Sequence, residues 1–77
     1  MNKPRRKQLS ELVDRLNDLL SDLDILKDEE DDYLNNIAEN LQNSERYERA
    51  EEAYNYLDEA YSGLEEVISN IESAIEA

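Results

Sequence analysis

The sequence of 77 residues contains no cysteine and no histidine, and only one glycine and one proline. Without cysteine, the chain has no disulfide or thiolate–metal link to stabilise a fold. Without histidine, it lacks the commonest general base and metal ligand. One glycine and one proline argue against a fold rich in tight turns or strands. Together these absences favour a single small all-α domain that is held together by packing.

Positive charge is also scarce, because 8 basic side chains face 21 acidic ones and the net charge is −13. No apolar run approaches the roughly 18 residues of a transmembrane helix. The basic start at residues 3–7 is followed by LSELVDRLNDLL, whose charged residues exclude a secretory signal peptide. We therefore expect a soluble, cytoplasmic protein without membrane attachment.

A seven-residue repeat fills the second half of the chain, which divides into AEEAYNY, LDEAYSG, LEEVISN and IESAIEA. Such a heptad pattern is typical of a helix that buries one apolar stripe against other helices. It predicts a second helix over about residues 44–76, with Ser44 as N-cap and with Glu45 and Glu48 favourable in the first turn. The stripe has two rows, one of Tyr47, Tyr54, Tyr61, Ile68 and Ile75 and one of Ala50, Leu57, Leu64 and Ile71, and Ala53, Ala60, Val67 and Ala74 widen it.

The first half predicts another long helix, over about residues 4–36, with Pro4 in its first turn and Asn2 or Lys3 outside it. Asparagine-rich residues 37–43 predict the turn between the two helices. The apolar side chains of the first helix fall on two main rows and a widening one: Leu9, Leu16, Leu23 and Ile37; Leu12, Leu19, Leu26 and Tyr33; and Val13, Leu20 and Leu34. Glu30 is the one charged residue that we place on this stripe.

Two helices joined by a short turn form an antiparallel hairpin, the predicted fold. Its register pairs Tyr33 with Tyr47, Leu26 with Tyr54, Leu19 with Tyr61 and Leu12 with Ile68; it places Arg5 and Arg6 beside Glu72 and Glu76, and Arg46 and Arg49 beside Glu30 and Asp31. A rival interpretation begins a third helix at Ser62-Gly63, where the sequence resembles a capping box.

A lone hairpin leaves one side of each apolar stripe uncovered, and such stripes suit bundles of three or four helices. We therefore expect two hairpins to form a homodimeric four-helix bundle. Docking of the spare apolar surface on another protein, or a monomer with a loosely packed core, are the alternatives.

Acidic pairs recur every seven residues on the second helix and form what we call the acidic ladder: Glu51, Glu52, Asp58, Glu59, Glu65 and Glu66. No Lys or Arg follows Arg49 to relieve this charge, which suggests a basic partner, although a merely solvated face is the simpler interpretation. Tyr56 lies among the acidic pairs on the outer face, where a tyrosine is a candidate contact residue. We predict that these seven residues bind a basic protein surface.

Other chemistries find little support in the sequence. Residues 28–32 (DEEDD) lack the spacing and glycine of a calcium loop, and consecutive carboxylates on a helix diverge. Two slim helices offer no cleft in which carboxylates would act as acid and base. We expect no enzyme activity, no cofactor, no metal and no direct nucleic-acid binding.

Three segments, NKPRRKQL, NNIAENLQNSERYERAEEA and LEEVISNIESAIEA, resemble small acidic helical proteins of bacteriophages and mobile elements of Gram-positive bacteria. Some of those proteins have proline at the position of Ala38, in agreement with a turn there. Small acidic phage proteins often act against host defence, so the resemblance implies an inhibitor of the anti-CRISPR or anti-restriction type in a bacterial cytoplasm. Its partner would be a nucleic-acid-binding protein, because carboxylates can replace phosphates against Lys and Arg. The alternatives are a structural, self-assembling bundle and a small adaptor.

Overall fold

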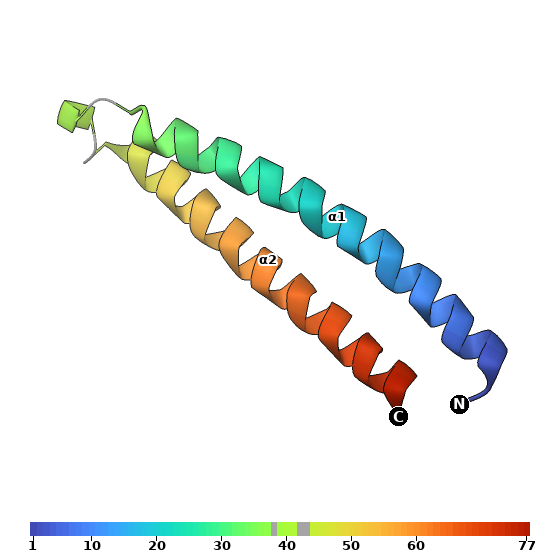
Figure 1. Cartoon of the computed structure of the whole chain (residues 1–77). Coiled ribbons are helices and arrows are strands. Elements are labelled where there is room, and N and C mark those ends of the chain that lie inside the picture. The colour runs from blue at the N-terminus through green and yellow to red at the C-terminus, as the bar shows by residue number, and fades with distance from the viewer. Residues whose placement is uncertain (38, 42–43) are drawn as a thin grey trace.

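The chain folds into two long helices that run antiparallel, as a computed structural model shows for residues 1–37, 39–41 and 44–77 (Figure 1). Helix α1 spans Lys3–Asn35, and helix α2 spans Glu45–Glu76. A short 3-10 helix, η1, covers Glu39–Leu41 in the connection and was not predicted. The predicted all-α hairpin is confirmed.

Local sequence explains where α1 begins and ends. The side chain of Asn2 accepts a hydrogen bond from the backbone N–H of Arg5 at 2.8 Å, so Asn2 is the N-cap, and Pro4 lies in the first turn, where no donor is needed. At the other end, the N–H of Asn36 donates to the carbonyls of Asp32 and Tyr33. Ile37 follows and is buried, which anchors the start of the turn against the helix pair.

Helix α2 begins as predicted at Ser44, whose hydroxyl accepts from the N–H of Tyr47 at 3.3 Å. The helix then continues without a break through Gly63 to Glu76. The alternative of a third helix starting at Ser62-Gly63 is therefore wrong. Of the predicted turn, Ala38, Gln42 and Asn43 lie outside the described residues.

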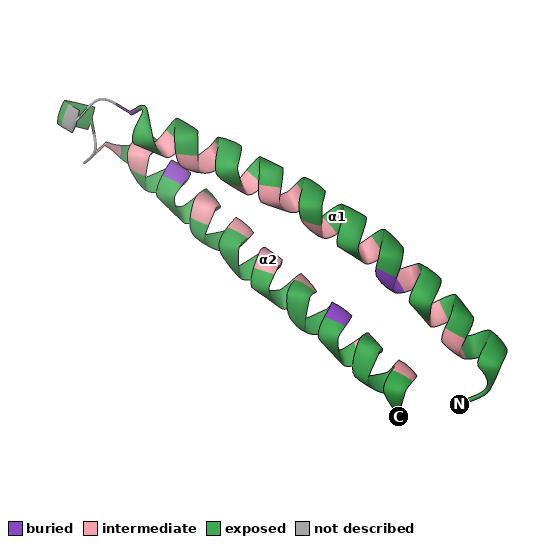
Figure 2. Cartoon of the chain, viewed as in Figure 1, coloured by how far each residue is buried: buried purple, intermediate pink, exposed green. Residues whose placement is uncertain are grey.

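The two rows of the α2 stripe are the predicted ones, since every member is buried or half-buried (Figure 2). The residues that we expected to widen this stripe are exposed instead: Ala53, Ala60, Val67 and Ala74. On α1 the row of Leu9 is confirmed, and so is the predicted widening row of Val13, Leu20 and Leu34, which is buried or half-buried. The second inner row of α1 is Val13, Leu20, Lys27 and Leu34. The predicted second row is wrong, because Leu19 and Leu26 are 56% and 55% exposed and Tyr33 is 40% exposed. The pairings of Leu19 with Tyr61 and of Leu26 with Tyr54 are corrected with it.

The reason for this correction lies in the partner helix. Both candidate rows flank the row of Leu9 and both follow a seven-residue spacing, so α1 by itself does not distinguish them. The row of Leu19 is the more apolar, whereas the row that faces α2 contains Lys27. Lys27 is accommodated because α2 offers it the carboxylate of Asp58 and the ring of Tyr61, while its aliphatic stem covers apolar surface.

The hairpin is thin for its length. Its Cα atoms extend over 59 × 16 × 12 Å, and the radius of gyration is 17.5 Å, whereas a compact domain of this length has about 11.5 Å. Among the described residues, only Val13, Ile37, Ala50 and Ile68 are buried, and no large side chain is fully enclosed. Stability therefore depends on a single narrow seam of half-buried side chains.

Continuity of α2 generates a prediction for Gly63→Ala. An added Cβ at Gly63 would meet no atom within 4 Å, and glycine in an exposed helix interior costs about 0.5–1 kcal/mol relative to alanine. We expect urea unfolding to show a stabilisation of about that size, and thermal unfolding a Tm higher by roughly 4 °C. The matched variant Ser69→Gly, at another exposed position of α2, should shift both in the opposite direction. A destabilised Gly63→Ala protein would contradict a continuous helix.

Candidate partner-binding surface

The acidic ladder faces outward along α2. Its pairs follow immediately after the inner residues Ala50, Leu57 and Leu64, so the heptad carries them away from the seam. All six carboxylates are exposed. Successive pairs are separated by seven residues, or about 10.5 Å along the helix axis. The structure thus presents three acidic pairs in regular order on a straight support.

Four of the seven predicted contact residues surround one shallow hollow on α2. Glu51, Glu52, Tyr56 and Glu59 line it together with Glu48 and Asn55. Tyr56 is 64% exposed, the highest value among the large apolar and aromatic side chains. An aromatic ring beside several carboxylates suits a Lys or Arg side chain, which can pair with the acids and lie over the ring. Glu65 and Glu66 lie farther along the helix and do not line this hollow.

Asp58 differs from the other ladder residues because it bonds across the hairpin. The Nζ of Lys27 lies 2.9 Å from its Oδ1 and 4.9 Å from the centre of the Tyr61 ring. The Lys27 side chain is 17% exposed, and that of Asp58 is 54% exposed. The hydrogen bond from Lys27 to Asp58 raises the pKa of the lysine above its ordinary 10.5, although partial desolvation opposes this. Asp58 therefore holds the helices together as well as contributing charge.

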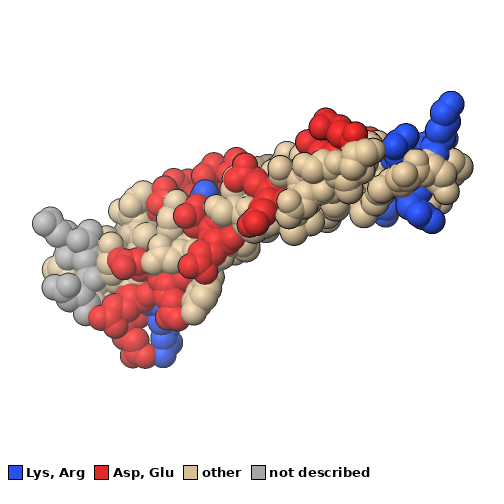
Figure 3. All heavy atoms as spheres, turned by 90° about the horizontal axis from the view of Figure 1, so that it is seen from below, with Lys and Arg blue, Asp and Glu red and all other residues tan. Residues whose placement is uncertain are grey.

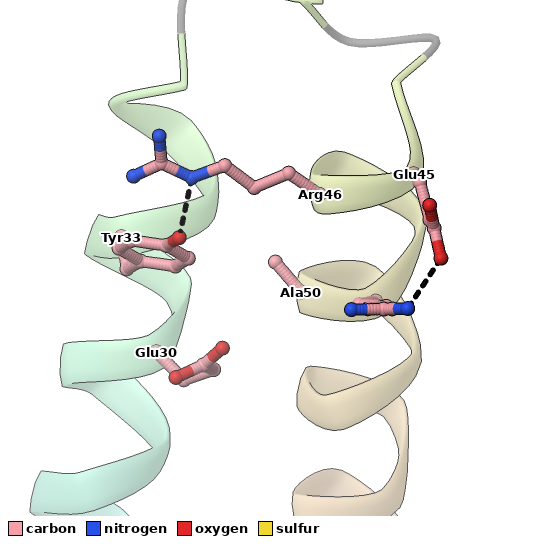
Figure 4. A pocket seen from close by; sticks show the side chains of 6 residues that line it. Glu30, Tyr33, Glu45, Arg46 and Ala50 are labelled. Atoms are coloured by element: carbon pink, nitrogen blue, oxygen red, sulfur yellow. Dashed lines mark hydrogen bonds and ion pairs between the residues drawn. The ribbon is translucent and has the colours of Figure 1, made fainter.

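A second hollow, which the sequence did not reveal, lies at the turn end of the hairpin (Figure 4). The Nε of Arg46 donates to the hydroxyl of Tyr33 at 2.7 Å, and its guanidinium lies 5.4 Å from the centre of that ring. Arg49 pairs with Glu45 on its own helix. Glu30 lines the same hollow, together with Ala50.

The charges of this second hollow balance, since two arginines face two glutamates, and the hollow offers no excess charge to a ligand. The prediction that Arg46 and Arg49 lie beside Glu30 is right for position only. In the described part of the chain neither arginine forms an ion pair with Glu30 or Asp31, because each has a nearer partner. The contact between Tyr33 and Arg46 was not predicted. The sequence feature that would have indicated it is the position of the two residues on matching flanks of the two apolar stripes.

The basic residues near the N-terminus lie at the end of the rod opposite the turn (Figure 3). One of them, Arg6, donates through Nη2 to the backbone carbonyl of Ala77 at 3.2 Å. We had predicted that Arg5 and Arg6 lie beside Glu72 and Glu76, but over the described residues the structure contains no ion pair between these arginines and these glutamates. The contact of Arg6 with the last residue of the chain nevertheless confirms that the helices are antiparallel along their whole length.

Residues 28–32 do not assemble a metal centre: across the described ranges, no three Asp or Glu residues converge in a way that could hold an ion. Neither of the two helices contains, in its described part, a stretch long and apolar enough to cross a membrane. No protein-family model, no curated protein and no solved structure matches this chain.

The pair of Lys27 and Asp58 generates a prediction about pH. Because the pKa of Lys27 is raised in the folded state, the pair stabilises the protein at neutral pH, and this stabilisation is lost as the pH rises past 10.5 and through the raised value. We expect Asp58→Asn to lower the Tm by a few degrees at neutral pH and to differ less from the wild type in strong alkali. Thermal unfolding followed by circular dichroism across this range measures the difference.

The control for this experiment is Glu59→Gln, which removes an adjacent ladder charge that makes no contact with Lys27. It should leave the Tm at or above the wild-type value at every pH, because it removes one negative charge from a chain whose net charge is −13. A gap between the wild type and Asp58→Asn that stays constant through the alkaline range would contradict the assigned role of Lys27.

Proposed function

We propose that this protein is a non-enzymatic interaction protein whose acidic ladder binds a basic surface of a partner protein. The observation that carries the proposal is an outward row of carboxylate pairs with no Lys or Arg after Arg49 on the same helix. Glu52 also lies four residues after Glu48, a spacing at which like charges on a helix repel at a cost of a few tenths of a kcal/mol. A basic partner would turn this repulsion into attraction.

The spacing of the ladder supports a partner that normally binds a nucleic acid. One step of about 10.5 Å is close to the rise of three nucleotides of a DNA strand, at 3.4 Å each. The net charge of −13 over 59 Å gives one charge per about 4.5 Å, against one per 1.7 Å for duplex DNA and one per 3.4 Å for one strand. The match in density is better for a groove that holds a single strand.

In this proposal the protein is a nucleic-acid mimic that inhibits its partner by occupying the groove. The resemblance to small acidic proteins of phages and mobile elements suggests a defence protein as the partner, with inhibition of the anti-CRISPR or anti-restriction type in the bacterial cytoplasm. Binding would be competitive with nucleic acid and would weaken at high salt, because exposed charges are screened.

A structural role has one observation in its favour, the exposed apolar row of Leu19 and Leu26. This row lies on α1, whereas the ladder lies on α2. Self-association through the row is therefore compatible with partner binding through the ladder, and the two functions need not exclude each other.

The structure provides a sharper test of the ladder than reversal of Asp58, which would also remove the contact with Lys27. Glu65→Lys with Glu66→Lys reverses one exposed pair that lines neither hollow. The protein is immobilised, and the heparin-binding fraction of a Gram-positive lysate is passed over it. We expect the wild type to retain a partner that duplex or single-stranded DNA releases, and the double variant to retain it at least about tenfold less.

The matched control is Asp14→Lys with Asp18→Lys, which changes the net charge equally on the exposed side of α1. It should retain the partner almost as well as the wild type does. Equal loss in both double variants would show that overall charge, and not the ladder, is responsible. Retention that neither variant weakens, or that DNA does not compete, would refute the proposed mimicry.

A further inference from the structure

The two long sides of the hairpin differ in character, and two contacts identify them. On one side Arg46 of α2 bonds to Tyr33 of α1. On the other side Asp58 of α2 pairs with Lys27 of α1. Because residues seven apart lie on the same flank of a helix in such a pair, each contact fixes which further residues lie along its side.

The Arg46 side is apolar along its length. The row of Tyr33 continues through Leu12, Leu19 and Leu26, and the row of Arg46 continues through Ala53, Ala60, Val67 and Ala74. Leaving out Arg46, we call the other eight residues of these two rows the neutral face: Leu12, Leu19, Leu26, Tyr33, Ala53, Ala60, Val67 and Ala74. None of them is acidic, and of the eight only Leu12 and Tyr33 come near the seam: Leu12 is half-buried and Tyr33 contacts Arg46. Figure 3 shows uncharged surface between the acidic groups and the basic end of the rod.

The hairpin exposes more surface than a folded monomer of its mass usually does, by about the area of a protein interface. The accessible surface of the chain is 5847 Å², whereas a folded monomer of 9.0 kDa has about 4,900 Å². The excess of roughly 1,000 Å² is close to the ~800 Å² that each partner buries in a standard interface. One broad side of the rod, 59 Å by 16 Å, offers an area of the same size.

We propose that a second copy of this chain covers the neutral face, related by a two-fold axis that passes between Leu19 and Ala60. The contact of Tyr33 with Arg46 sets Leu19 level with Ala60 when it is extended along both helices in steps of seven. About this axis the face is complementary to itself. Leu19 meets Leu19 of the other copy, Leu12 meets Leu26, and the small side chains of α2 allow its backbone to approach its counterpart closely.

Charge selects this axis over the alternative. A two-fold axis across the rod places the turns at opposite ends of the dimer, so the basic residues 3–7 of one copy lie near the acidic residues 28–32 of the other. An axis along the rod would instead bring the two basic ends together and the two acidic ends together. The same cross-rod axis brings Arg5 to the ring of Tyr33 in the other copy, a contact of the kind that Arg46 already makes within the chain.

This dimer is a four-helix bundle, and it does not depend on the proposed function of the acidic ladder. The Lys27 side of the hairpin, where Asp58 lies, faces away from the second copy. The carboxylates of the ladder therefore stay accessible, and the dimer displays two ladders. Tyr56 lies at the border of the neutral face, since it is three residues after Ala53 and four before Ala60.

The first test compares two exposed apolar residues of α1 with nearly equal exposure, Leu19 at 56% and Ile25 at 58%. Leu19→Glu places two carboxylates face to face on the axis, so sedimentation should show a dimer weakened by about tenfold or more. Ile25 lies off the neutral face, and Ile25→Glu should change the dissociation constant by less than about twofold. Circular dichroism should show intact helices in both. A monomeric wild type, or equal effects of both substitutions, would overturn the proposal.

The second test measures the axis itself. Because the chain has no cysteine, Ser21→Cys and Asn35→Cys each give one site for a spin label, on exposed positions of α1. The cross-rod axis predicts that the two Asn35 labels of a dimer are about 40 Å farther apart along the rod than the two Ser21 labels. Similar distances for both pairs would place the turns at the same end and overturn the proposed axis.

Discussion

The structure depends on a single seam, along which two antiparallel helices pack apolar side chains at seven-residue intervals. The chain carries a net charge of −13, so its acidic groups repel one another, and packing along this seam opposes that repulsion. The seam is narrow, with only four buried residues in the described part of the chain. The hairpin therefore has little stability to spare, and any surface that adds apolar burial gains importance.

Lys27 shows how the seam accommodates a charge. It lies on an inner row, yet it reaches Asp58 at the edge of the seam and the ring of Tyr61 beside it. The hydrogen bond to Asp58 and the charge of that carboxylate outweigh desolvation of the lysine, so the pKa of Lys27 is raised and its charged form is favoured. The consequence is that one acidic residue of the ladder serves the fold, whereas the remaining five are not held by a cross-helix ion pair in the described chain.

The surface of the hairpin has three regions, and each has a chemistry of its own. The ladder on α2 is acidic, the N-terminal end is basic, and the neutral face is apolar. Acidic and apolar surfaces on opposite sides permit one molecule to bind a basic partner and a second copy at once. Pairing of the basic end with residues 28–32 of that copy would also neutralise part of the charge that each hairpin carries alone.

Much of this fold could be predicted from the sequence, because the period of a helix and its capping residues are local properties. Asn2, Ser44, the continuity through Gly63 and the outward position of the ladder all follow from residues within a few positions of each other. The choice of inner row on α1 does not. Leu19 and Lys27 both belong to rows with the correct spacing, and only Asp58 and Tyr61 of the facing helix favour the lysine. The row that faces α2 was therefore decided by the tertiary structure, because the contacts available on one helix determine which side chains of the other helix pack against it. As a result, the row of Leu19 stays uncovered, on the same side of the hairpin as the alanines of α2.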